Sequence, residues 1–132
     1  MRRLVLLLVA AAIVAAGLAV HLLAPKDAVG DAIGDVLYAV LIGLLVAFAA
    51  PRAAWWGTGA VALAWCVGVE LLQLTSLPAS LGAAFEPLKL VLGTTFAPWD
   101  LLWYALGVVL AAGVDGALRR RGGRAVRRPE AG

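Results

Sequence analysis

Two pairs of polar residues with helical spacing stand out in this sequence as candidates for chemistry. Glu70 and Gln73 lie three residues apart in the apolar segment CVGVELLQL, and Asp100 and Tyr104 lie four residues apart in DLLWYALG. Side chains at these separations share one face of an α-helix. Carboxylates in unlike environments can act as general acid and base, and carboxylate, amide and phenol groups can also hold a polar ligand by hydrogen bonds. The spacing leaves both kinds of site open.

The same residues also have structural interpretations. Asp31, Asp35 and Asp100 can lie in the first turn of a helix, where a carboxylate interacts favourably with the helix dipole. Glu70 and Gln73 do not precede a helix start, so their structural alternative is a polar contact between helices. We therefore expect Glu70 and Gln73 to be the centre of any functional site.

The composition predicts the elements that carry these residues. Of the 132 residues, 64% are hydrophobic and 14% are charged, whereas about a quarter are charged in ordinary soluble domains. A small soluble fold cannot bury so much apolar surface, and no stretch alternates polar with apolar residues as barrel strands do. The sequence predicts an all-α, polytopic membrane protein with four transmembrane helices, formed by the apolar stretches 4–23, 36–50, 53–74 and 101–118.

Two of these stretches need comment. The second is short for a spanning helix, which needs about 20 residues, unless it begins near Ile33. The first follows Met-Arg-Arg and could be a secretory signal peptide. We expect it to be retained as a helix, because it is about 20 residues long and has no clear small-x-small cleavage site before His21.

Basic residues set the expected orientation. Nine of the eleven lie at the N-terminus, at Arg52 or after residue 118, and only Lys26 and Lys89 lie elsewhere. Short basic flanks stay in the cytoplasm. Both termini are therefore predicted to be cytoplasmic, in the cell inner membrane, with residues 1–118 as one four-helix domain and residues 119–132 as a disordered basic tail.

In this orientation polar side chains gather in the outer third of the bilayer. The predicted outward-facing cluster consists of Asp35, Glu70, Gln73, Asp100, Tyr104, His21 and Tyr38. The histidine and the tyrosines also fit a plain interfacial role. The cytoplasmic halves are expected to hold almost nothing polar. The long apolar outer segment 75–98, in which Pro78 would end the third helix, is expected to re-enter the bilayer or to lie on it as a short helix. It would form a lid over the cluster or simply seal the bundle.

The expected partners follow from charge and small residues. The lipid bilayer is the first, and the tail arginines either fix topology or also contact anionic lipid; they are Arg119, Arg120, Arg121, Arg124, Arg127 and Arg128. Small-xxx-small pairs, Gly107 with Ala111 and Ala112 with Gly116, fit close helix packing within the chain, a homodimer or a membrane partner. No cofactor, metal cluster or nucleic acid is expected, because Cys66 stands alone and no aromatic residue separates the arginines.

Four segments in order resemble a known family. GDVLY (34–38), ELLQ (70–73), LGTTF (92–96) and DLLWYALG (100–107) are similar to small bacterial membrane proteins of the domain of unknown function 2809 family, over about residues 4–118. More distantly, the E-x-x-Q of 70–73 and the aspartate that opens the last helix resemble VanZ-like membrane proteins, which are associated with glycopeptide resistance. VanZ-like sequences usually carry an Arg and further Asp and Asn residues before the closing Gly, which this chain lacks. The closer family has no assigned activity, so this resemblance implies topology.

These observations favour a non-catalytic membrane module whose outward cluster binds a lipid-linked or other envelope small molecule. The alternatives are a structural or accessory subunit of a membrane complex and an intramembrane acid–base enzyme that uses Glu70. Catalysis is the less favoured, because no nucleophile–base pair, metal-ligand triad or phosphate loop has a recognisable spacing.

Overall fold

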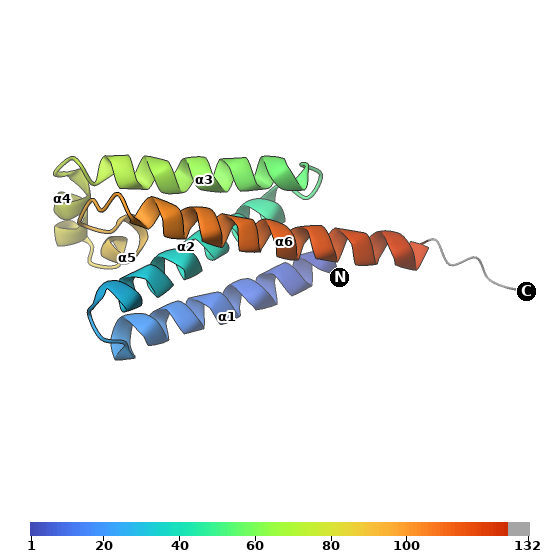
Figure 1. Cartoon of the computed structure of the whole chain (residues 1–132), viewed down its shortest axis with the longest axis horizontal. Coiled ribbons are helices and arrows are strands. Elements are labelled where there is room, and N and C mark those ends of the chain that lie inside the picture. The colour runs from blue at the N-terminus through green and yellow to red at the C-terminus, as the bar shows by residue number, and fades with distance from the viewer. Residues whose placement is uncertain (127–132) are drawn as a thin grey trace, which may run out of the picture.

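The computed structural model describes residues 1–126, which contain helices and no strand (Figure 1). Four of the helices are long and apolar enough to cross a membrane, which confirms the predicted fold class. The described helices are α1 (Arg2–Leu23), α2 (Ala28–Ala49), α3 (Trp55–Leu72), α4 (Leu77–Ala84), α5 (Leu88–Leu92) and α6 (Asp100–Val126).

The bundle has two ends of different character. The α1–α2 link (residues 24–27) and the segment from 73 to 99, with α4 and α5, lie together at one end, here called the loop end (Figure 1). The start of α1, the α2–α3 link (residues 50–54) and the last turns of α6 lie at the other, here called the arginine end. The charge asymmetry of the sequence predicts that the loop end faces outward.

The helices α2 and α6 form the central pair and approach each other through glycine. A Cβ atom added to Gly107 of α6 would lie 2.5 Å from the carbonyl oxygen of Val36 and 2.6 Å from the Cβ atom of Ala39. Two turns further along α2, a Cβ atom on Gly43 would lie 2.5 Å from that of Ala111. Gly107 and Ala111 therefore pack within the chain, as small residues at membrane helix contacts do.

Two apolar clusters surround this central pair. One joins α1 to α2 and α6 and consists of Leu6, Ala10, Val40, Leu44, Ala47 and Ala111. The other joins α3 to α2 and α6 and consists of Ala39, Ala62, Cys66, Tyr104 and Val108. The buried Cys66 thus has the packing role expected for a small, lone cysteine.

The second helix begins earlier than the apolar stretch predicted. Asp27 is its N-cap: the Oδ1 atom accepts hydrogen bonds from the backbone N–H groups of Val29 (3.1 Å) and Gly30 (2.9 Å). The helix therefore begins before the predicted apolar stretch and includes Asp31 and Asp35, so α2 has 22 residues and is long enough to span. Asp31 lies in the first turn as expected, but Asp35 lies about a turn deeper, so it does not act as a first-turn acid there.

The segment between α3 and α6 contains two short helices. The third helix ends at Leu72, and Pro78 lies in the first turn of α4, where its missing N–H group is harmless. Pro78 therefore begins α4, and the expectation that it ends the third helix was wrong. The expected short helix in LKLVL is α5.

The sixth helix extends beyond the predicted membrane domain. It continues to Val126, so residues 119–126 are helical where the sequence suggested a disordered tail. Arginine and alanine are good helix formers, and Arg119 Nε donates a hydrogen bond of 2.7 Å to Asp115 Oδ2 one turn earlier. Residues 127–132, with Arg127 and Arg128, lie outside the described residues.

Candidate functional site

A cavity of about 1230 Å³ lies at the loop end, between α1, α2, α5 and the start of α6; it is here called the outer cavity. It is lined by six of the seven predicted cluster residues: His21, Asp35, Tyr38, Gln73, Asp100 and Tyr104. The helices therefore bring most of the predicted cluster to one space, although these residues come from α1, α2, α6 and the segment after α3.

Glu70, the seventh predicted residue, does not line the outer cavity. Its side chain is completely buried. The Oε1 atom accepts a hydrogen bond of 2.6 Å from the Ala97 N–H group, and the Oε2 atom accepts one of 3.5 Å from the Tyr104 hydroxyl. The carboxyl group thus fixes the backbone that leads into α6. Glu70 positions other residues of the site and is not itself accessible from the cavity.

Gln73 fixes the other end of the same segment. Its Nε2 donates a hydrogen bond of 2.8 Å to the carbonyl oxygen of Leu92, at the end of α5. The next residue, Gly93, has φ 61° and ψ −174°, a conformation open almost only to glycine. A Cβ atom there would lie 2.4 Å from Gln73 Nε2, so glycine is needed for the close approach of the amide as well. The amide places α5 at the rim of the cavity.

Two acceptors on cavity residues are left without a hydrogen-bond partner among residues 1–126. They are Asp35 Oδ2 and Gln73 Oε1, and both atoms are buried. The Asp35 carboxyl group interacts with that of Asp100 across α2 and α6, and its further acidic neighbours are Glu70 and Asp31. Because buried acceptors normally have partners, the site is suited to a ligand that donates hydrogen bonds.

The two predicted tyrosines lie side by side between α2 and α6. Their ring centroids are 6.1 Å apart at an interplanar angle of 56°. The Tyr38 hydroxyl accepts a hydrogen bond of 2.9 Å from Trp65 Nε1, whereas the Tyr104 hydroxyl is directed to Glu70. Both rings are therefore held in place and form part of a preformed wall of the cavity.

Two lysines contribute to the outer cavity, and the sequence alone predicted neither of them. Lys26, in the α1–α2 link, and Lys89, on α5, both line the outer cavity, together with Glu86. Lys26 Nζ donates a hydrogen bond to the His21 carbonyl oxygen at the end of α1. The stem of Lys89 lies against Gly82 of α4, where an added Cβ atom would be 2.6 Å from Lys89 Cγ. The only signal in the sequence was that these lysines are the basic residues outside the predicted cytoplasmic flanks.

The outer cavity also has an apolar wall that descends toward the middle of the bundle. It is formed by Ile13, Val14 and Leu18 of α1 and by Leu37 and Leu41 of α2. From Asp31 to Leu41 the lining runs along about 15 Å of helix, at 1.5 Å per residue. The cavity is therefore polar at its mouth and apolar below, which suits an amphipathic ligand.

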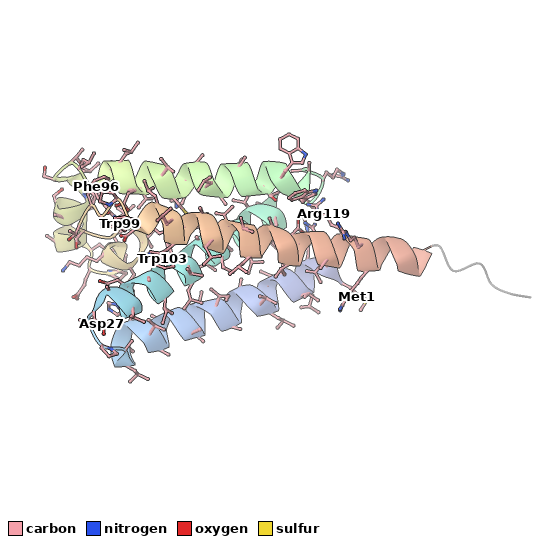
Figure 2. The ribbon with its side chains drawn as sticks, in the orientation of Figure 1. Met1, Asp27, Phe96, Trp99, Trp103 and Arg119 are labelled. Carbon is pink, nitrogen blue, oxygen red and sulfur yellow. The ribbon has the colours of Figure 1, made fainter. Side chains whose placement is uncertain are left out.

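A smaller cavity of about 410 Å³ lies beside the first, between the starts of α2 and α6. Trp99 and Trp103 line it with Asp31 and Asp100, and both labelled tryptophans lie toward the loop end in Figure 2. Asp31 and Asp100 line both cavities, so they form the partition between them. Within the described residues, no group of three or more His, Cys, Asp or Glu side chains is arranged to hold a metal ion.

The arginine end contains a buried ionic cluster that sequence analysis also missed. Asp115 is 1% exposed and binds Arg2 Nε at 2.8 Å and Arg119 Nε at 2.7 Å. Arg2 also donates to the carbonyl oxygens of Ala47 and Pro51, where α2 ends (3.3 and 3.4 Å). The labelled Met1 and Arg119 lie toward this end in Figure 2.

The expectation that the predicted cytoplasmic halves hold almost nothing polar was therefore wrong. Asp115 and Thr58 are both buried there. Asp115 went unnoticed because it lies inside an apolar stretch and its partner Arg2 is 113 residues away. The signal available was its position four residues before Arg119, the spacing of a helical ion pair.

Fold and cavity together define a polytopic membrane protein of four spanning helices with a preformed cavity at one end. The chain belongs to the family described as protein of unknown function (DUF2809), whose model matches residues 24–108. This confirms the resemblance seen in the sequence, while the more distant similarity to VanZ-like proteins stays a prediction. The matched region contains every predicted cluster residue except His21, and it ends before Asp115. No curated protein and no solved structure matches the chain.

Proposed function

We propose that this chain is a non-catalytic membrane module that binds a lipid-linked or other envelope small molecule in the outer cavity. The observation that carries the proposal is the composition of that cavity, in which ionic and amide groups at the mouth adjoin an apolar wall on α1 and α2. A ligand pocket normally combines a mostly apolar lining with a few convergent polar groups. An amphiphile can place its head group at the mouth and its chain along the wall.

The segment between α3 and α6 forms part of the rim of the outer cavity and is held in place by hydrogen bonds, which supports the proposal. Glu70 and Gln73 hold it at Ala97 and Leu92, on either side of Gly93. Lys89 and Glu86 on this segment contribute to the cavity lining. A preformed rim lowers the conformational cost of binding, because its residues need not be ordered by the ligand.

A cavity-filling substitution tests the proposal without altering any charge. Gly34 of α2 and Gly17 of α1 both line the outer cavity, and an added Cβ atom at either position meets no atom within 4 Å. Gly34→Leu should therefore fold, but should occupy the space that a ligand needs. The matched control is Gly68→Leu on α3, which also meets nothing within 4 Å and does not line the cavity.

The measurement is thermal unfolding of the purified proteins in detergent, with and without extracted envelope lipids. A ligand present at 100 times its Kd stabilises the folded state by about 2.7 kcal/mol. Wild type and Gly68→Leu should show this lipid-dependent shift, and Gly34→Leu should lose it while keeping its stability in detergent alone. Equal shifts in all three proteins, or none in any, would refute binding in this cavity.

We also propose that the protein lies in the inner membrane of a bacterial cell, with the loop end facing away from the cytoplasm. This orientation is supported by the arginine end, where Arg2 and Arg52 lie with the last turns of α6. Ser80→Cys should react with a membrane-impermeant maleimide added to intact cells, and Arg52→Cys should react only after lysis. Cys66 is buried, so the native thiol should stay unlabelled. The opposite labelling pattern would reverse the orientation.

A structural or accessory subunit is the second candidate function. The observation that favours it is an α6 surface outside the intrachain contacts, where Gly113 and Gly116 have nothing within 4 Å of an added Cβ atom. Copurification of a stoichiometric membrane partner that is lost in Gly113→Leu would support this candidate. The acid–base enzyme has less support, because Glu70 is buried away from the cavity and both of its oxygens are hydrogen-bonded.

A further inference from the structure

We infer that the ligand of the outer cavity is a zwitterionic amphiphile, a single molecule that carries a primary ammonium, a phosphate and at least one acyl chain. This inference rests on the binding function proposed above and specifies its ligand. Phosphatidylethanolamine is the simplest lipid of this chemistry.

Acidic and basic side chains line the same cavity. Asp31, Asp35 and Asp100 line the cavity from α2 and α6, and Lys26 and Lys89 line it from the α1–α2 link and α5. Within residues 1–126, both side-chain ion pairs involve Asp115 at the opposite end of the bundle, so none joins these lysines to these acids. Carboxyl and ammonium groups that line one cavity without pairing with each other match a ligand that brings a complementary group to each.

The unpartnered acceptors of the cavity indicate that the ligand's cation is a primary ammonium. The partnerless buried atoms Asp35 Oδ2 and Gln73 Oε1 are both acceptors, and both belong to cavity residues. A primary ammonium has three N–H donors, as many as the two acceptors and the Asp100 carboxyl group together require. A quaternary ammonium has no N–H group and would leave them unpaired, which is costly for buried polar atoms. The site should therefore distinguish ethanolamine from choline.

The two lysines of the cavity are the groups that would bind the ligand's phosphate. Lys26 uses one of its three donors on the His21 carbonyl oxygen, which leaves two for a ligand. The stem of Lys89 is held against Gly82 of α4. Lysine binds phosphate as a point charge, and it needs no fork geometry to do so. The acyl chain then follows the wall of Ile13, Leu18 and Leu41 toward the middle of the bundle.

The test uses the full chain in detergent and four lipids with identical acyl chains. Phosphatidylethanolamine, phosphatidylcholine, phosphatidylglycerol and phosphatidic acid are titrated separately, and binding is measured by native mass spectrometry. Wild type should bind phosphatidylethanolamine at least about tenfold more tightly than the other three, the factor expected for one charge-assisted hydrogen bond. Equal binding of phosphatidylcholine would overturn the primary-ammonium assignment, and equal binding of phosphatidylglycerol or phosphatidic acid would overturn the need for any cation. Either result would leave the proposed function standing. If no lipid binds in a manner that Gly34→Leu abolishes, both the assignment and the proposed function fail.

Two variants separate the ammonium from the phosphate. Asp35→Asn should reduce the preference for phosphatidylethanolamine over phosphatidylglycerol by about tenfold, while binding of phosphatidylglycerol stays unchanged. Lys89→Gln should weaken the binding of phosphatidylethanolamine and of phosphatidylglycerol by the same factor. The control is Asp27→Asn, which makes the same chemical change outside the cavity and keeps the helix cap, because asparagine caps as well as aspartate. An unchanged preference in Asp35→Asn, with wild-type unfolding in detergent, would contradict the inference.

Discussion

Replacing Gly107 by alanine should weaken the central contact of the bundle. The new Cβ atom would lie 2.5 Å from the Val36 carbonyl oxygen, whereas real Cβ contacts are essentially never shorter than 3.0 Å, so α2 and α6 must separate by about 0.5 Å there. A gap of 0.5–1 Å forfeits about a quarter to a half of the dispersion energy of the atoms that line it. Overpacking of this kind costs about 1–3 kcal/mol, and the higher helix propensity of alanine offsets about 0.5–1 kcal/mol. The expected net loss in the free energy of unfolding is about 1 kcal/mol, near the middle of the range that these two contributions leave.

The matched control is Gly113→Ala, almost two turns along the same helix, where an added Cβ atom meets nothing within 4 Å. This variant gains helix propensity without a clash and should be as stable as wild type or more so. Both proteins would be unfolded with increasing sodium dodecyl sulfate in mixed micelles, followed by far-ultraviolet circular dichroism and tryptophan fluorescence. If Gly107→Ala unfolded at the same detergent fraction as Gly113→Ala, the close α2–α6 contact would not be the packing that holds the bundle together.

Two further predictions concern the ends of the bundle. Asp115→Asn should reduce the free energy of unfolding by about 3 kcal/mol, the lower part of the range for breaking a buried ion pair. The lower part applies because the partner side chains of Arg2 and Arg119 are 21% and 27% exposed. The same unfolding in mixed micelles measures this loss, and wild-type stability of the variant would refute the prediction. Gly93→Ala should cost about 1–3 kcal/mol of local stability, because residue 93 has a positive φ. The new side chain should also displace the Gln73 amide from Leu92. Amide hydrogen exchange should therefore accelerate in residues 85–97 and stay unchanged in α2. Unchanged exchange in that segment would show that Gln73 does not hold it, and Gly68→Ala serves as the control.

The hydropathy of the sequence was sufficient to predict the four spanning helices, because long apolar stretches leave few other folds. The start of α2 was missed because Asp31 and Asp35 interrupt its first two turns. The cap by Asp27 begins a helix there that hydropathy alone assigns to the loop. The residues of the candidate cluster were found from polar side chains at similar predicted depths. Six of them line one cavity, which depth alone did not establish.

What the sequence could not provide was the partner of each polar group. Glu70 was expected to be the centre of the site, but its Oε1 accepts from the backbone N–H group of Ala97. The pattern of side chains in a sequence does not indicate which backbone group will donate. Lys89 reaches the cavity only because α4 and α5 fold back over the bundle end. Asp115 and Arg2 meet through the arrangement of the first and last helices. Contacts between distant segments depend on the path of the chain, and a single sequence does not contain that path explicitly.

The dependence of the earlier helices on α6 has a consequence for membrane insertion. Helix α6 is made after the others, and it carries Asp115, the carboxylate partner of Arg2, and Tyr104, whose hydroxyl donates to Glu70. Until α6 enters the bilayer, Arg2 lacks its carboxylate partner and Glu70 lacks the Tyr104 hydroxyl, although Ala97 is already present. Polar groups without partners in lipid are costly. We therefore expect the order of synthesis to leave an incompletely packed intermediate until α6 is inserted. A nascent chain halted before Asp100 should remain associated with the insertion machinery, and completion of α6 should release it.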